Sequence, residues 1–399
     1  MKESKVISNL KVRGGISQVY AVQIDPYRLI STIGAAANFP YGSTAGYTIG
    51  NSVYDPNLKP EQTVSKEVGI DIGFLNNRIT LEASAYTQKT KDQEITLGVD
   101  LSSSTGFTSA VINTGEGQNK GIEVTLNAAP VIALANGFRW NVGVNYSYNT
   151  NKVLSLYQGQ SSLSIGDNNY IVLGQSYPSL QVSSYQTDPQ GRTIVDANTG
   201  LPLNNPVNKD FGQTNPTTIL GLNTSVTFKN FTLSGVAEYR SGNVFYSGLA
   251  STLDFTGNSY TSAEAGRERF VYPNSVIQTS PGVYTPNTNV TVNNGGGSFW
   301  SGGIRRDVAS NYVSSAAFWK IRELSLSYQV PVSWLQNHGK FVKSASIALV
   351  GRNLFMFRPS DNIFTDPEIN VGTGNAQGVN NLNQTPPTRI YGFTASIGF

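Results

Sequence analysis

The sequence predicts an all-β protein whose strands form a portion of an antiparallel transmembrane β-barrel. Three observations lead to this fold class. Apolar and polar residues alternate along ten segments, the connections between these segments alternate between short and long, and charged residues make up only 13% of the 399 residues. Soluble proteins carry about 25% charged residues. Barrels of the outer membrane combine short periplasmic turns with longer extracellular loops, which matches the second observation.

Each strand is predicted from alternation with a period of two, because successive side chains of a strand point to opposite faces of a sheet. The clearest example is Phe138 to Asn149, where Trp140, Val142, Val144 and Tyr146 interleave with asparagine, glycine and serine. The segments with this pattern are 7–20, 62–75, 78–97, 118–132, 137–150, 217–228, 231–241, 316–330, 341–356 and 389–399.

The connections predict which end of the sheet faces the cell exterior. The short ones are Leu75–Asn77, Pro130–Asn136, Lys229–Asn230 and Pro331–Lys340, and the long ones are 21–61, 98–117, 151–216, 242–315 and 357–388. Strands joined by hairpins pair antiparallel and in sequence order. We therefore expect the short turns at one end and the long loops at the other. A soluble β-rich protein with decorated loops is the alternative, and it gives no reason for this alternation.

The two faces of the predicted strands differ in a way that suits a hydrated barrel interior. The polar face consists mainly of Gly, Ser, Asn and Thr with few charges, and its lumen-facing candidates are Glu82, Arg139, Glu238 and Arg240. The apolar face is expected to meet outer-membrane lipid.

Composition and motifs argue against enzymatic chemistry. There is no cysteine, the single histidine is His338 in a predicted short turn, and the net charge of +3 gives no basic stripe for nucleic acid. TGEGQNKG at Thr114–Gly121 has the wrong spacing for a dinucleotide fingerprint and is interpreted as a loop. GGGSFW at Gly295–Trp300 lacks the Lys-Ser/Thr of a phosphate-binding loop. We expect no catalytic, cofactor-binding or metal-binding residues.

Recognition is expected in the long outer loops, particularly in 242–315, which is rich in aromatic residues. Aromatic faces beside polar side chains suit stacking on sugar rings or contact with peptides. The alternative is that these rings pack the loop onto its neighbours. The substrate-contact candidates are Tyr246, Tyr260, Phe270, Tyr272, Phe299 and Trp300.

The C-terminus and a series of motifs carry a family resemblance. The ending RIYGFTASIGF places Tyr391, Phe393, Ile397 and Phe399 on one face, and it looks like the C-terminal signal that the barrel-assembly machinery recognises. Further motifs follow one another along the chain: NLKPEQTVSKEVGIDIGFLNNRITLEASAYTQKTKDQ, GQNKGIEVTLNAAPV, YQTDPQGRTIVDANTG, NPTTILGLNTSVTFKNFTLSGVAEYRSGNVFY, FWKIRELSLSYQVPVSWL, GRNLFMF, DPEIN and PPTRIYGFTASIGF. Together they resemble the SusC/RagA branch of the TonB-dependent outer-membrane transporters of Bacteroidetes-type bacteria.

The resemblance implies a 22-stranded barrel filled by an N-terminal plug, of which residues 1–399 would be the C-terminal part, without the plug. The N-terminus has no apolar stretch typical of a secretory signal, which fits this interpretation. Family members import large nutrients, commonly oligosaccharides or peptides. The implied partners are a SusD-type surface lipoprotein and TonB, the latter through the missing N-terminal region. The alternative is a passive structural or adhesive outer-membrane barrel of about ten strands without a plug.

Overall fold

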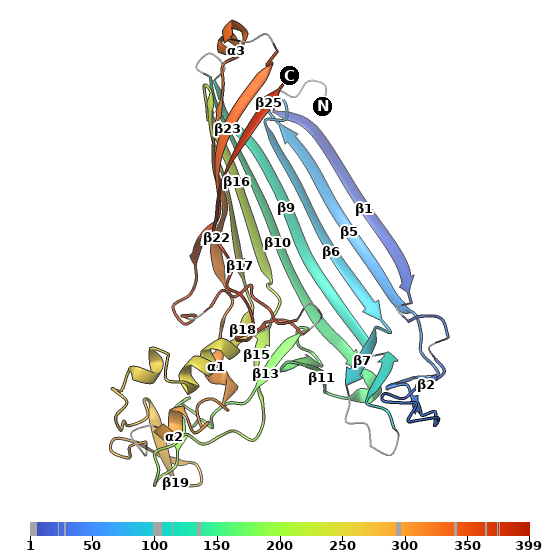
Figure 1. The fold of residues 1–399 in the computed structure, drawn as a ribbon, viewed down its shortest axis with the longest axis vertical. Coiled ribbons are helices and arrows are strands. Elements are labelled where there is room, and N and C mark those ends of the chain that lie inside the picture. Colours follow the sequence, from blue (N-terminus) through green and yellow to red (C-terminus); the bar gives the residue numbers. More distant parts are fainter. Residues whose placement is uncertain are drawn as a thin grey trace.

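The computed structural model of the chain contains a ten-stranded antiparallel sheet, here called the wall (Figure 1). The structure describes residues 6–22, 24–27, 29–98, 106–113, 115–133, 137–292, 297–338, 341–363, 365–372, 374 and 376–399. The wall strands, in their order across the sheet, are β1 (Ile7–Ala21), β5 (Glu61–Phe74), β6 (Ile79–Lys91), β9 (Gly115–Ala133), β10 (Phe138–Leu156), β16 (Thr218–Phe228), β17 (Phe231–Ser241), β22 (Phe318–Gln329), β23 (Ser344–Phe357) and β25 (Ile390–Gly398). Each predicted segment contributes one wall strand, and sequence order equals spatial order, as predicted.

The strand register separates the residues into two faces, and two neighbouring rows show the separation. One row, read across eight strands, is Leu10, Ile72, Leu81, Leu126, Val144, Leu222, Ala237 and Ile321. The row one residue further along is Lys11, Asp71, Glu82, Thr125, Asn145, Gly221, Glu238 and Lys320. A slip of one residue in any strand would move its apolar side chains to the polar face, so the alternation fixes the register.

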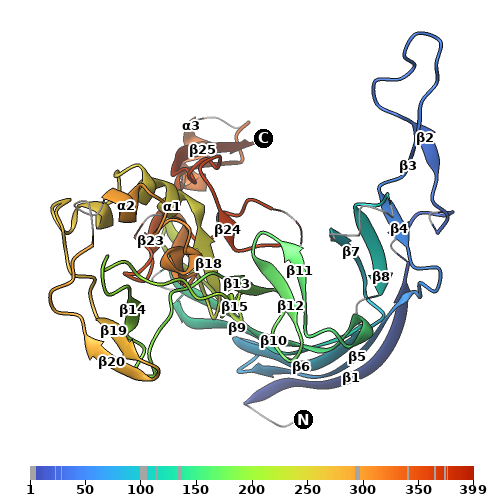
Figure 2. The ribbon, with the colours of Figure 1, turned by 90° about the horizontal axis from the view of Figure 1, so that it is seen from below.

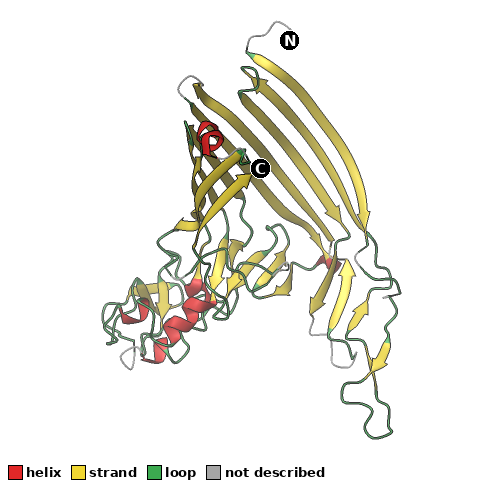
Figure 3. Ribbon diagram, turned by 45° about the horizontal axis from the view of Figure 1, so that its top comes forward, coloured by secondary structure: helices red, strands yellow, loops and turns green. Residues whose placement is uncertain are grey.

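The described residues of the short connections, the start of β1 and the end of β25 lie at the same end of the wall, and the long connections lie at the other end (Figures 1 and 3). Residues 134–136 of the predicted turn Pro130–Asn136 lie outside the described residues. One connection differs from its prediction. Pro331–Lys340 contains the helix α3 (Val332–His338), whose first turn is closed by hydrogen bonds from the Trp334 and Leu335 N–H groups to the Pro331 carbonyl. No helix within the described ranges is both long and apolar enough to cross a membrane.

Several segment boundaries also differ from prediction, and three of the differences matter for the fold. Segment 78–97 divides into β6 and a separate strand, β7 (Glu94–Gly98), and β10 extends to Leu156 rather than 150. Gly115–Gly121, predicted to be a loop, belongs to β9 and pairs with both β6 and β10. Glycine and asparagine content therefore did not indicate a loop there. Thr114, the other end of that motif, lies outside the described residues.

The wall is a curved, open sheet (Figure 2). Within the described part of the chain, the edge strands β1 and β25 each pair with one neighbour, β5 and β23 respectively, and not with each other. The polar row faces the concave side, where Lys320 contacts Asp366 of the connection 357–388.

The long connections are folded rather than irregular, a feature that their loop-like composition did not predict. Their small sheets are β2 (Ile33–Ala35) with β3 (Tyr47–Ile49); β4 (Ser52–Tyr54), β8 (Ser109–Asn113) and β7; β11 (Ser162–Gly166), β12 (Asn169–Val172), β13 (Ser179–Val182) and β15 (Lys209–Gln213); β14 (Thr193–Val195), β19 (Ser275–Ser280) and β20 (Val283–Pro286); and β21 (Val313–Ser315), β18 (Val244–Ser247) and β24 (Val379–Asn380). The helices α1 (Gly248–Phe255) and α2 (Gly297–Trp300) lie among them, with 3-10 turns at Tyr157–Gly159, Thr261–Ala263 and Ala309–Tyr312.

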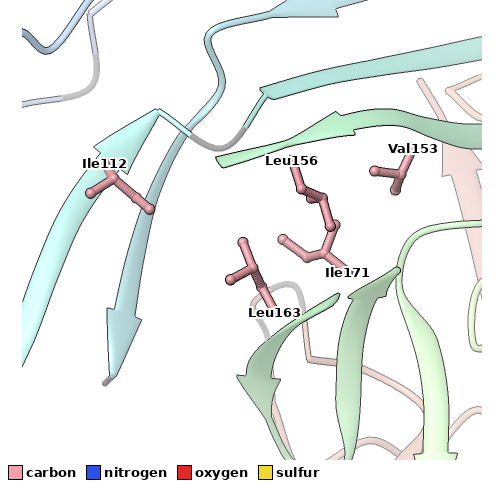
Figure 4. Close-up of a cluster of buried hydrophobic side chains, with 5 residues drawn as sticks. All are labelled: Ile112, Val153, Leu156, Leu163 and Ile171. Atoms are coloured by element: carbon pink, nitrogen blue, oxygen red, sulfur yellow. The ribbon is translucent and has the colours of Figure 1, made fainter. Parts of the chain in front are cut away.

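Buried apolar side chains are concentrated in these outer loops. Leu180 and Phe245 are 0% and 1% exposed, whereas Leu349 and Phe393 on the apolar face of the wall are 60% and 78% exposed. Where the wall meets the loops, one cluster combines Ile112, Val153, Leu156, Leu163 and Ile171 from β8, β10, β11 and β12 (Figure 4). The hydrophobic core thus stabilises the outer loops, while the wall exposes its apolar residues on one face.

Candidate functional site

The concave face carries a charge cluster built from three segments that are distant in sequence. It comprises Glu238 and Arg240 of β17, Lys320 and Arg322 of β22, and Asp366 and Glu368 of the connection 357–388. Alternation places the two residues of β17 on one face. The register between β17 and β22 shifts beside Arg322, between the pairs Val236–Glu323 and Ala237–Ile321, and this shift leaves Arg322 free to reach Glu238.

The wall cations hold Glu368 in a dense set of charged hydrogen bonds. Arg322 Nη1 donates to Glu368 Oε2 at 2.8 Å, and Arg322 Nη2 donates to the other carboxylate oxygen. Lys320 Nζ also donates to Glu368, and it donates to Asp366 Oδ2 at 2.6 Å. Arg240 Nη2 lies 3.5 Å from Glu368 Oε1. Glu238 completes the cluster, since it accepts from Arg240 Nε at 2.5 Å and from Arg322 Nε at 2.7 Å.

Burial strengthens these interactions. The side chains of Lys320, Asp366 and Glu368 are 7%, 5% and 23% exposed. Burial disfavours the ionised form of Glu368, but the hydrogen bonds from Arg322 and Lys320 outweigh it and lower the pKa of this carboxyl to about 2. The ring of Phe318, which is 3% exposed, lies 4.9–5.8 Å from the three wall cations and adds cation–π contacts.

A second buried ion pair organises the outer loops. Arg305 Nε donates to Asp254 Oδ2 at 2.7 Å, and the hydroxyls of Ser259 and Thr261 donate to Asp254 Oδ1 at 2.5 and 2.6 Å. Burial alone would lower the pKa of Arg305, but Asp254 more than compensates and raises it. The pair stays ionised and ties α1 to the segment after α2. The guanidinium of Arg305 also lies 5.0 Å from the ring of Trp300.

Most of the aromatic substrate-contact candidates pack against other rings. Phe299 is 1% exposed and lies 5.7 Å from Phe270, 5.8 Å from Tyr272 and 5.0 Å from Trp300. In this conformation Phe299 has no free face for a substrate, so the packing alternative describes it. Tyr246 makes an edge contact with a neighbouring ring at 6.4 Å.

Two of these tyrosines differ in exposure. Tyr260 is 77% exposed and presents a free ring, so its predicted contact with substrate stays a prediction that the geometry permits. Burial raises the pKa of Tyr272, which keeps its hydroxyl protonated at neutral pH.

The remaining candidates lie on the wall. Glu82 is exposed in the polar row, and Arg139 alternates with the apolar Trp140 on β10, which places it on the polar face. Tyr391, Phe393 and Ile397 of β25 share the apolar face, opposite Gly351, Leu349 and Ala345. Phe399 is 78% exposed. Recognition of these C-terminal residues by assembly machinery stays a prediction.

Sequence reasoning found two of the six cluster residues, Glu238 and Arg240, and missed the other four. Lys320 and Arg322 gave the only available signal, because two cations stand close together in a strand whose polar face is otherwise mild. His338 ends α3, and across the described residues no group of three potential metal ligands occurs.

Comparison with known proteins identifies the fold. A family model described as "TonB dependent receptor-like, beta-barrel" matches residues 5–354. The chain belongs to the TonB-dependent receptor family. It is therefore an outer-membrane protein of the Bacteroidetes type, and the SusC/RagA resemblance is confirmed.

The curated relatives of this TonB-dependent receptor chain are named as receptors. TonB-dependent receptor P26 of Formosa agariphila is 25% identical over 428 residues, covering 98% of this chain and 40% of the relative. TonB-dependent receptor SusC of Bacteroides thetaiotaomicron is 28% identical over 297 residues, covering 66% of this chain and 29% of the relative. The chain thus spans well under half the length of these relatives.

Solved structures agree on the fold. The structure of the RagAB peptide transporter superimposes with a TM-score of 0.73 at 17% identity, covering 99% of this chain and 41% of that chain. The "open-open" state of the RagAB peptide importer gives a TM-score of 0.71 with the same identity. At this identity the likeness establishes the fold alone.

Proposed function

We propose that this chain supplies part of the barrel wall and five outer loops of a TonB-dependent importer. The cargo is a nutrient too large to diffuse through a pore, such as an oligosaccharide or a peptide. The observation that carries the proposal is the two-faced wall, which ends on one side in folded loops. An apolar outer face suits lipid, a polar concave face suits a hydrated path, and folded loops provide a surface for capture.

We further propose that the chain is the C-terminal part of a longer protein whose additional strands complete a 22-stranded barrel. An open sheet edge in hydrocarbon leaves unpaired N–H and C=O groups that cost several kcal/mol each. Within the described residues β1 and β25 are such edges. The passive ten-stranded barrel requires these two strands to pair with each other, so the register favours completion by other strands.

The proposed partners follow from this role. A SusD-type lipoprotein would cover the outer loops, and TonB would act through the N-terminal part of the proposed longer protein. The barrel-assembly machinery would recognise the residues from Tyr391 to Phe399. Tyr260 is the residue proposed to contact cargo, and Glu82 and Arg139 belong to the proposed polar path. The name of the RagAB peptide transporter supports peptides as one cargo class.

Uptake in living cells tests the proposal. Fluorescent oligosaccharides and peptides are offered to wild-type cells, to cells without the gene and to cells without TonB. We expect uptake of at least one probe class to be lost in both mutants. Uptake that persists without TonB would favour the passive barrel, and uptake restored by residues 1–399 alone would contradict the proposed partial wall.

A further inference from the structure

The charge cluster divides unequally between the wall and the connection 357–388, here called the strap. The wall contributes three cations, Arg240, Lys320 and Arg322, and one carboxylate, Glu238, for a net charge of +2. The strap contributes the two carboxylates of Asp366 and Glu368. The strap therefore neutralises a surplus of positive charge that belongs to the wall.

We propose that Arg240, Lys320 and Arg322 form a carboxylate-binding site on the wall, that Glu368 of the strap occupies this site as an internal ligand, and that the carboxylate of an acidic cargo competes for it. The inference rests on the proposed import function for its cargo class, which it narrows to acidic peptides or acidic sugars.

The geometry at Glu368 is that of a receptor for any carboxylate. Arg322 donates from both terminal nitrogens to the two oxygens of Glu368, the paired arrangement in which a guanidinium recognises a planar carboxylate. Lys320 adds a third donor. The wall itself preorganises the site. Glu238 accepts from Arg322 Nε at 2.7 Å and from Arg240 Nε at 2.5 Å, and these hydrogen bonds fix both guanidinium groups.

The site is reachable from the concave side. Arg322 lines two cavities, one of about 310 Å³ beside the strap and one of about 350 Å³ over the wall. The second cavity also contains Asn145, Thr125 and Glu238, so it lies on the polar face. A ligand within it would lie beside the guanidinium that now holds Glu368, and displacing one carboxylate by another preserves the charge balance.

The strap has attachments besides Glu368, including the ion pair of Asp366 with Lys320 at 2.6 Å and hydrogen bonds from Ser314 and Ser315 to Asp361, so losing the Glu368 contact is expected to loosen it locally without releasing it. Its strand β24 pairs with β18 through only two residue pairs, Tyr246–Val379 and Ser247–Asn380. The Asn169 side chain donates to the Gln377 carbonyl at 3.0 Å. Asn380 Oδ1 in this strand is also buried without a hydrogen-bond partner.

The ionised state of Glu368 agrees with competition between charges rather than with release by protonation. Its pKa of about 2 keeps the carboxylate charged at neutral pH. A neutral ligand that displaced Glu368 would leave the three wall cations with only Glu238 and Asp366 as counter-ions, and the uncompensated positive charge is costly in a partly buried cluster. The site therefore discriminates against uncharged cargo.

Equilibrium binding to the complete protein, purified in detergent, tests the proposal without requiring transport. The probes are an end-blocked tetraglutamate peptide, its tetraglutamine counterpart, tetragalacturonate and a neutral tetrasaccharide. Glu368→Ala should vacate the site and tighten binding of an acidic probe about tenfold or more, the usual range for coupling between competing interactions, with no gain for the neutral probes.

Two further variants separate the site from a general effect of the strap. Adding Arg322→Gln to Glu368→Ala should abolish the gain, although Glu368 is absent from the strap in both variants. Glu323→Gln is the matched control. Glu323 lies on the same strand as Arg322 but pairs with Arg352 of β23 at 2.9 Å, with side chains 37% and 60% exposed, so this variant should leave binding unchanged.

The outcomes decide both the proposal and the source of the carboxylate. A gain for tetraglutamate alone assigns the site to acidic peptides, a gain for tetragalacturonate alone assigns it to acidic sugars, and a gain for both supports the shared chemistry. No gain for either, or an equal gain for the neutral probes, overturns the proposal.

Should Glu368→Ala fail to fold, hydrogen exchange of residues 365–372 in the wild-type protein replaces it. Saturating acidic probe should accelerate exchange there, and unchanged exchange overturns the proposal. If the protein binds a probe but cells that produce it do not take that probe up, the result would instead count against the import function.

Discussion

Placing a charge on the apolar face tests the orientation of the wall most directly. Val144 lies on β10 between Leu126 and Leu222, and its partner Leu222 stands near the middle of β16. A residue at mid-strand lies near the midplane of the bilayer, where an arginine on the lipid face is most costly, about 2–4 kcal/mol. We therefore expect Val144→Arg to destabilise the inserted protein by that amount.

The neighbouring residue provides the matched control. Asn145 points to the opposite face, where it pairs with Thr125 and Gly221 and accepts a hydrogen bond from Thr125 Oγ1 at 3.1 Å. Asn145→Arg should lower the free energy of unfolding by only about 0.5–1.5 kcal/mol, the contribution of that hydrogen bond. The cost is small because the new charge lies on a polar surface. Urea unfolding of the complete protein in phospholipid vesicles measures both values. Equal destabilisation by the two variants would refute the assignment of the faces.

Three other perturbations test the loops, the charge cluster and the wall. Phe299→Ala should cost about 3–5 kcal/mol through the cavity left in the outer-loop core, measurable as faster limited proteolysis within 242–315, and unchanged proteolysis would contradict its packing role. The folded-state pKa of Glu368, about 2, lies below its ordinary value of 4.5, so its contribution of about 3 kcal/mol is present above pH 4.5 and is lost as the pH falls towards 2. Hydrogen exchange of the strap should accelerate in that window, and acceleration at pH 5–7 would oppose the assignment. A Cβ at Gly121 would lie 2.5 Å from the Tyr86 ring, so Gly121→Val should displace that ring and cost about 1–3 kcal/mol in the same unfolding assay, whereas a neutral effect would show that the ring has room to move.

The wall could be predicted from sequence because each strand carries its own evidence. In β10 the alternation from Phe138 to Asn149 fixes the face of every residue, and the short connection from the preceding strand, β9, fixes the pairing of these two strands. Neighbouring strands repeat the same pattern, so the register follows without knowledge of distant contacts. Composition failed only where it was read by itself, as at Gly115–Gly121, where glycine and asparagine occupy a long strand.

The outer loops and the charge cluster could not be predicted because their contacts join distant segments. Leu180 and Phe245 are buried although they stand in different connections rich in glycine and asparagine, where neither shows a periodic pattern. Glu368 lies 46 residues from Arg322, and no local pattern relates them. Phe299 resembled a recognition residue because an aromatic side chain in a loop has the same sequence signature whether it is exposed or buried.

The two parts of the molecule depend on different physical interactions, and the strap contacts both. The wall is held by its backbone ladder and exposes apolar side chains to a surrounding apolar phase, whereas the outer loops bury their apolar side chains among themselves. The strap joins the loops through β24 and the wall through Asp366 and Glu368. A change in the charges that hold Glu368 would therefore alter how the loops are tied to the wall without disturbing the ladder or the core. Under the proposed competition by an acidic cargo, the charge cluster is the place where cargo would act on the loops, since the contacts replaced are those of the Glu368 carboxylate rather than those of either folded part.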